Sequence, residues 1–106
     1  MRLGVLIDLQ PNVEDGFRPL KELGLSGCQL GCWDDSLFTA EIAGKVRAVA
    51  EDLGARISSL WCGWPGPRVW DFSEGYLTLG LVPPEYRYAR LEFLKRGSDF
   101  AKLLGV

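Results

Sequence analysis

The sequence predicts an α/β fold in which strands and helices alternate as β-α-β-α-β-α. Three helix-period segments end in the same dipeptide, at Leu23-Gly24, Leu53-Gly54 and Leu104-Gly105. Each glycine stands where a helix C-terminus favours a residue with positive φ. Short apolar runs at 2–7, 25–32 and 56–63 supply the strands. Strands separated by helices pair in parallel through right-handed crossovers, so a parallel sheet is expected.

The first helix follows the strand at 2–7. We expect Asn12 to cap it and Val13, Phe17 and Leu20 to share its buried face. Pro19 must then lie near the first turn, or else the helix kinks at that position.

The second and third helices have clearer patterns. Thr39 is a candidate N-cap, and the apolar face of the second helix is expected at Ile42, Val46, Val49 and Leu53. Pro83-Pro84 suits the first turn of the third helix, where a missing N–H costs nothing. Its buried stripe is expected at Tyr86, Ala89, Phe93, Gly97, Phe100 and Leu104.

Ligands of such folds bind beyond the carboxyl ends of the strands, which selects the loops 8–12, 31–36 and 64–83. The third loop is an insertion, since Gly24 and Gly54 are 30 residues apart whereas Gly54 and Gly105 are 51 apart. Long loops in compact domains are usually lids or binding segments. Its aromatic residues either stack on a sugar ring or cover the open end of the sheet: Trp64, Trp70, Phe72 and Tyr76.

The second strand alternates between an apolar and a small or polar side. Cys28, Leu30 and Cys32 fall on one side, and Gln29 falls on the other between Gly27 and Gly31. Gln29 either lines a barrel centre or is an ordinary hydrogen-bonded core amide. The cysteines, Cys62 included, form no C-x-x-C pair and are expected to be small buried hydrophobes.

Composition excludes several function classes. The chain has no histidine, so it contains no Ser-His-Asp triad and no histidine-ligated metal. A net charge of −2 suggests no general affinity for nucleic acid or membranes. The N-terminal apolar run is too short for a secretory signal, so a cytoplasmic location is expected. The basic residues of the last helix are expected to form a solvated face: Arg87, Arg90, Lys95 and Arg96.

A family resemblance rests on Leu3-Gly4-Val5, on residues 21–30, and most specifically on 64–72, continuing through 80–87 and 99–106. In these segments the chain resembles the first three β/α units of the sugar phosphate isomerase/epimerase family, which has the xylose isomerase-like TIM barrel. Relatives often place an acidic residue where this chain has Gln29.

The resemblance implies a full barrel of about 250 residues, so residues 1–106 are expected to be a partial domain that ends before strand four. It places the metal ligands and catalytic glutamates on strands four to eight, so no catalytic or metal-binding residue is expected here. The parent protein would use a divalent metal (Mn, Mg or Zn) to isomerise or epimerise a sugar or sugar phosphate. The chain would contribute part of the substrate pocket wall: Asp8, Gln29, Trp33, Cys62, Trp64 and Trp70.

Two other readings stay open, a stand-alone carbohydrate- or protein-binding module and a half-barrel that only self-associates. Endonucleases of the same superfold are less favoured, because they take a histidine metal ligand from this region. Open sheet edges and an inward face containing Leu6, Leu30 and Leu60 predict a homodimer, formed through the open edges or by swapping of an element. If the aromatic loop is a lid, proteolysis is expected to cut first between Trp64 and Pro83.

Overall fold

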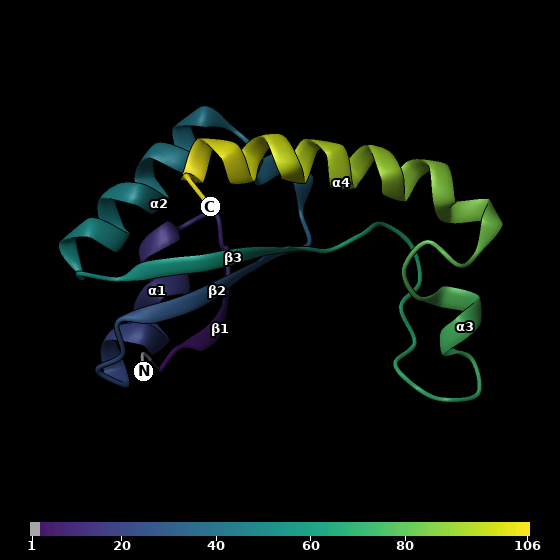
Figure 1. Ribbon diagram of the computed structural model, residues 1–106, viewed down its shortest axis with the longest axis horizontal. Helices are drawn as coiled ribbons and strands as arrows, with labels where there is room; N and C mark the ends of the chain where they lie inside the picture. The colour runs from purple at the N-terminus through teal and green to yellow at the C-terminus, as the bar shows by residue number, and fades with distance from the viewer. Residues whose placement is uncertain (1–2) are drawn as a thin grey trace.

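Three short strands form a parallel sheet in the computed structural model, which describes residues 3–106 (Figure 1). The strands are β1 (Val5–Asp8), β2 (Gly27–Cys32) and β3 (Arg56–Cys62). Their spatial order is β1-β2-β3, and both neighbouring pairs are parallel. The predicted alternation of strands and helices in a parallel α/β arrangement is confirmed.

Three long helices connect and follow the strands: α1 (Val13–Glu22), α2 (Ala40–Asp52) and α4 (Pro84–Leu104). A 3-10 turn, η1 (Asp35–Leu37), and a short helix, α3 (Gly75–Thr78), lie in the loops. The glycines after the three long helices have φ of +63° at Gly24, +59° at Gly54 and +80° at Gly105. These left-handed conformations confirm the predicted helix ends, since a Cβ would strain them.

The predicted helix starts are confirmed in part. Thr39 caps α2, because its Oγ1 accepts a hydrogen bond from the Ile42 N–H at 3.2 Å. Asn12 stands at the N-cap of α1, but its side chain makes no capping hydrogen bond. Pro19 lies inside α1. Of the two expected alternatives, a position near the first turn is therefore wrong. Burial of one face of α1 outweighs the hydrogen bond that Pro19 cannot donate.

The core lies between one face of the sheet and the three long helices. Leu30 is completely buried there, and Leu60 packs against the same core. The expectation that Leu30 and Leu60 belong to the opposite, inward face is therefore wrong. A β-bulge between Ile57 and Ser59 sets Leu60 beside Leu30, so both side chains point toward the helices.

No helix among residues 3–106 covers the other face of the sheet, which carries both polar and apolar side chains. The strand register places two rows of side chains across it. One row joins Leu6, Gln29 and Ser59, and the next joins Asp8, Gly31 and Trp61. We call this surface the open face.

The outer edges of β1 and β3 have no neighbouring strand within residues 3–106. No helix in that range combines the length and the apolar composition that crossing a bilayer requires.

Candidate functional site

All four tryptophans of the chain gather at the carboxyl ends of β2 and β3, and we call them the tryptophan cluster. They close a ring in which each indole contacts two others, with centroid distances of 5.2–6.4 Å: Trp33, Trp61, Trp64 and Trp70. Edge-to-face and tilted arrangements at these distances are favourable for aromatic rings. The structure therefore brings together three predicted pocket residues and adds Trp61, which sequence reasoning missed.

Backbone geometry explains how the cluster packs so closely. Trp61 belongs to β3, Trp33 directly follows β2, and Trp64 and Trp70 belong to the aromatic loop, residues 64–83. A Cβ on Gly63 would collide with the Trp33 ring, so glycine is required beneath that indole. The side-chain nitrogen of Trp64 is buried and has no hydrogen-bond partner among residues 3–106.

Asp8 lies on the open face in the same row as Trp61. Its Oδ1 is only 2.7 Å from the position that a Cβ on Gly31 would occupy. The missing side chain at Gly31 thus leaves room for the carboxylate between β1 and β3. Asp8 and Trp61 are two strand spacings apart, about 10 Å between backbones. An exposed acceptor and an aromatic surface therefore border the same patch of the open face.

Gln29 lies one row deeper toward the amino end of the strands. It is exposed on the open face, and its Nε2 donates a hydrogen bond to Ser59 Oγ at 3.1 Å. Gln29 is therefore not a core amide, and its position on the open face agrees with a residue that lines a barrel centre.

The thiol of Cys62 lies on the other side of the sheet, away from the remaining predicted pocket residues. It approaches α4 so closely that a Cβ on Gly97 would collide with Cys62 Sγ. Burial raises the pKa of Cys62 and that of Cys32 to about 11, so both thiols are neutral at physiological pH. The structure therefore assigns Cys62 to helix packing.

The aromatic loop is folded. Thr78 Oγ1 accepts a hydrogen bond from the Val69 N–H at 2.9 Å, which joins the two sides of the loop. The Asp71 carboxylate accepts bonds from the backbone N–H groups of Ser73 and Glu74 at 2.9 and 2.6 Å. These bonds precede α3, which Figure 1 shows beyond the sheet near the start of α4.

Arg90 is buried beneath the aromatic loop, with an exposed fraction of 0%. The expectation of a solvated basic face holds for Arg87, Lys95 and Arg96 but is wrong for Arg90. Arg90 takes the place in the buried stripe that was expected for Ala89, which is exposed. Its spacing from Phe93 and the rest of that stripe was a signal that sequence reasoning missed.

Arg68 is the exposed cation of the site. Its guanidinium carbon lies 4.4 Å from the centre of the Trp33 ring, a cation–π distance. No carboxylate among residues 3–106 forms an ion pair with it. Arg68 therefore presents free N–H donors at the border of the tryptophan cluster.

A divalent metal does not fit the residues described here as a complete site. Within residues 3–106, no three side chains of histidine, cysteine, aspartate or glutamate lie close enough to share an ion. The single Asp8 carboxylate does not by itself make a complete metal site, because a bound divalent cation takes about six or more ligands.

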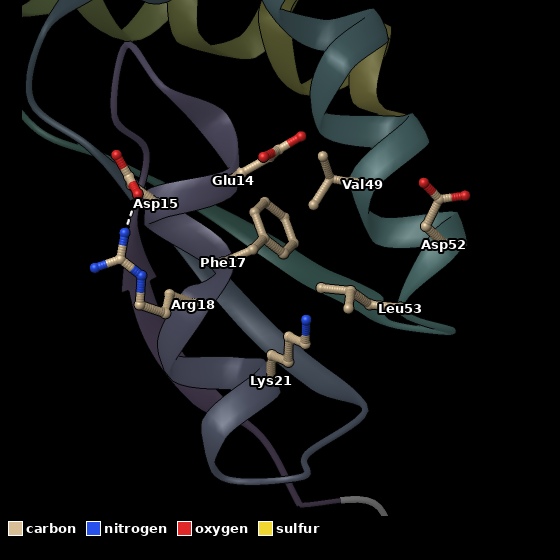
Figure 2. Close-up of a pocket in the computed structure, with 8 residues that line it drawn as sticks. All are labelled: Glu14, Asp15, Phe17, Arg18, Lys21, Val49, Asp52 and Leu53. Carbon is tan, nitrogen blue, oxygen red and sulfur yellow. Dashed lines mark hydrogen bonds and ion pairs between the residues drawn. The ribbon is translucent and has the colours of Figure 1, made fainter.

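A hollow of about 390 Å³ lies in the helix layer between α1 and α2 (Figure 2). Phe17, Val49 and Leu53 form its apolar part, and Asp15 and Arg18 pair with each other at its border. The hollow is formed by helix side chains rather than by the loops at the strand ends. Because ligands of such folds bind at the strand ends, the tryptophan cluster is the better candidate site.

A solved structure resembles this chain. It is the crystal structure of a xylose isomerase domain protein from Planctomyces limnophilus, with a TM-score of 0.86 and 26% sequence identity. The similarity covers 98% of this chain and 38% of that protein, so this chain spans well under half of its relative's length. No protein-family model and no curated protein sequence matches the chain. The match confirms the resemblance to xylose isomerase-like proteins and the assignment of the fold to a segment of such a domain.

Proposed function

Because a xylose isomerase domain protein matches this chain over 98% of its length, we propose that the chain forms part of the substrate pocket of a metal-dependent sugar or sugar phosphate isomerase or epimerase. The tryptophan cluster receives the apolar face of the sugar ring. Asp8 accepts hydrogen bonds from sugar hydroxyls on the open face. The acid–base residues of the reaction belong to other parts of the protein.

The observation that carries this proposal is the convergence of four indoles and one carboxylate at the carboxyl end of the sheet. Carbohydrates present both C–H faces and hydroxyl groups, so their pockets combine aromatic surfaces with a few placed polar groups. Trp70 remains 61% exposed, which leaves indole surface available to a ligand.

In the proposed reaction a proton is removed from or added to the carbon next to a carbonyl group. A bound divalent metal would polarise the sugar oxygens. The residues described here contain no three-ligand group, so the proposal assigns no metal ligand to this chain. What this chain contributes is orientation of the ring and exclusion of water from one side of the pocket.

The proposal is tested by titrating the chain with D-xylose, D-fructose and D-xylulose 5-phosphate while tryptophan fluorescence is recorded. Binding of one of these sugars should change the emission, because the only tryptophans lie in the cluster. Trp61→Ala should weaken that binding roughly tenfold or more, since a central aromatic contact commonly contributes this much.

Phe72→Ala is the matched control, because Phe72 is an aromatic residue of the same loop that is fully exposed. Its removal should leave the affinity unchanged. Absence of any fluorescence response to the three sugars, or equal loss of affinity in both variants, would argue against the proposed pocket.

A stand-alone binding module is the second candidate, and the closed helix-side core favours it. Phe17, Leu20 and Phe100 are almost completely buried within this chain alone, as expected for a unit that folds without further strands. Such a module would bind a sugar without converting it. Product analysis of the whole protein with the same sugars separates the two candidates, because only the isomerase yields a new sugar.

A further inference from the structure

We infer that Arg90 is the positioning residue that holds the aromatic loop in place, so that the loop is a preformed pocket wall rather than a mobile lid. This inference rests on the proposed function for its consequence in sugar binding. Its structural part, the fixing of the tryptophan cluster, is tested without any sugar.

Four backbone carbonyls of the loop accept hydrogen bonds from the Arg90 guanidinium. Nη1 donates to the carbonyls of Thr78 and Gly80 at 2.7 and 2.6 Å. Nε and Nη2 donate to the carbonyls of Pro65 and Pro67 at 3.2 and 2.9 Å. The acceptors come from both ends of the loop, so one side chain closes it across its base.

The electrostatic environment of Arg90 suits this role. Burial lowers the pKa of the guanidinium from its ordinary value, but an arginine remains charged in proteins. No ion pair joins Arg90 to a carboxylate among residues 3–106. The charge is instead balanced by the four carbonyl dipoles and by the rings of Trp64 and Tyr86, whose centres lie 5.5 and 5.0 Å from the guanidinium carbon.

The contact with Trp64 connects Arg90 to the candidate site. Trp64 packs against Trp33 and Trp70, at 5.2 and 5.8 Å between ring centres. Arg90 therefore fixes one indole of the cluster directly and the loop backbone on both sides of Trp70. Loss of Arg90 should release the loop and break the ring of indoles while the sheet and the other helices remain folded.

Lysine cannot replace this arrangement, because its ammonium is a compact point charge without a planar fork of donors. Both Arg90→Lys and Arg90→Met should therefore release the loop. The lysine variant keeps the positive charge, so it still tests the inference if the methionine variant does not fold. Arg87→Ala is the matched control. Arg87 lies one turn earlier on α4 and donates to the carbonyls of Leu81 and Val82, but it is exposed and does not reach the cluster.

Three measurements on the 106-residue chain test the inference. The close indole rings of the cluster should produce an exciton couplet in the circular dichroism spectrum. This couplet should be lost in the Arg90 variants and kept in Arg87→Ala. Cleavage between residues 64 and 83 should become at least roughly tenfold faster, because proteolysis follows the population of the open loop. Sugar affinity, measured by the fluorescence titration above, should fall by a similar factor. A rescue experiment complements these measurements. Millimolar guanidinium, added to an Arg90→Ala variant in place of the missing side-chain group, should restore part of the couplet.

An unchanged couplet and unchanged cleavage in Arg90→Lys would overturn the inference. Cooperative unfolding of the whole chain in every Arg90 variant would also overturn it, because the residue would then stabilise the fold rather than position the loop. If the couplet and cleavage change as expected but the wild-type chain binds no sugar, the positioning role stands and the proposed function fails.

Discussion

Replacement of Gly97 by alanine tests the assignment of Cys62 to helix packing. Gly97 lies on α4, opposite Cys62 of β3. An alanine Cβ would overlap Cys62 Sγ and would lie 3.2 Å from the Cys62 Cβ, with Phe38 in ordinary contact at 3.6 Å. The Cys62 sulfur is therefore the main obstruction, and the Cys62 Cβ is a smaller one that requires a shift of a few tenths of an ångström.

Two effects of opposite sign decide the magnitude. Adding a methyl group to a packed core costs about 1–3 kcal/mol, whereas alanine in place of glycine stabilises a helix interior by about 1 kcal/mol. Gly97→Ala should therefore lower the free energy of unfolding by about 1 kcal/mol. In a Cys62→Ala background the sulfur is absent, and Gly97→Ala should instead raise the free energy of unfolding by up to about 1 kcal/mol.

Urea unfolding of the wild type, both single variants and the double variant measures this change of sign, with a coupling energy of about 2 kcal/mol expected for residues in contact. Gly44→Ala on α2 is the matched control, because nothing lies within 4 Å of its Cβ position. It should stabilise the chain equally in both backgrounds. Equal destabilisation by Gly97→Ala with and without the sulfur would refute the reasoning and the placement of Cys62.

Three further predictions concern the thiols, the exposed arginine and the strand edges. Burial raises the pKa of Cys32 and of Cys62 from 9.0 to about 11. The stability that these neutral thiols contribute should therefore be complete below pH 9 and should be lost as the pH rises toward 11. Rapid alkylation of the folded chain by iodoacetamide at neutral pH would contradict this prediction. Because the Arg68 guanidinium can donate hydrogen bonds to a phosphate group, Arg68→Ala should weaken binding of D-xylulose 5-phosphate roughly tenfold and leave D-xylose unaffected. Equal effects in the two titrations would show that Arg68 does not bind the phosphate. Because β1 and β3 each pair with one strand only within residues 3–106, we expect the 106-residue chain to self-associate through open edges. Light scattering that shows a cooperatively folding monomer would refute this expectation.

Much of the candidate site could be predicted from its place in the fold. Parallel strands deliver their following loops to one end of the sheet, and this rule predicts that the loops carrying Asp8, Trp33, Trp64 and Trp70 lie there. The sequence analysis did not predict that Trp61 belongs to the site. Trp61 lies two residues before Gly63, whose missing side chain makes room for the Trp33 ring. Cys62 was chosen by its position at a strand end, but the structure turns its thiol toward α4.

The sequence by itself determined the alternation of strands and helices, the glycine ends of the helices and the cap at Thr39, because backbone dihedrals and short-range periodicity decide these features. The tertiary structure alone decided the side of β3 on which each residue lies, since a bulge near Ser59 shifts the pairing with β2. It also decided which groups accept hydrogen bonds from the buried Arg90 guanidinium, because those carbonyls lie 10 to 25 residues away along the chain. A buried arginine needs several carbonyls that converge in space, and no local pattern in a sequence reveals such convergence.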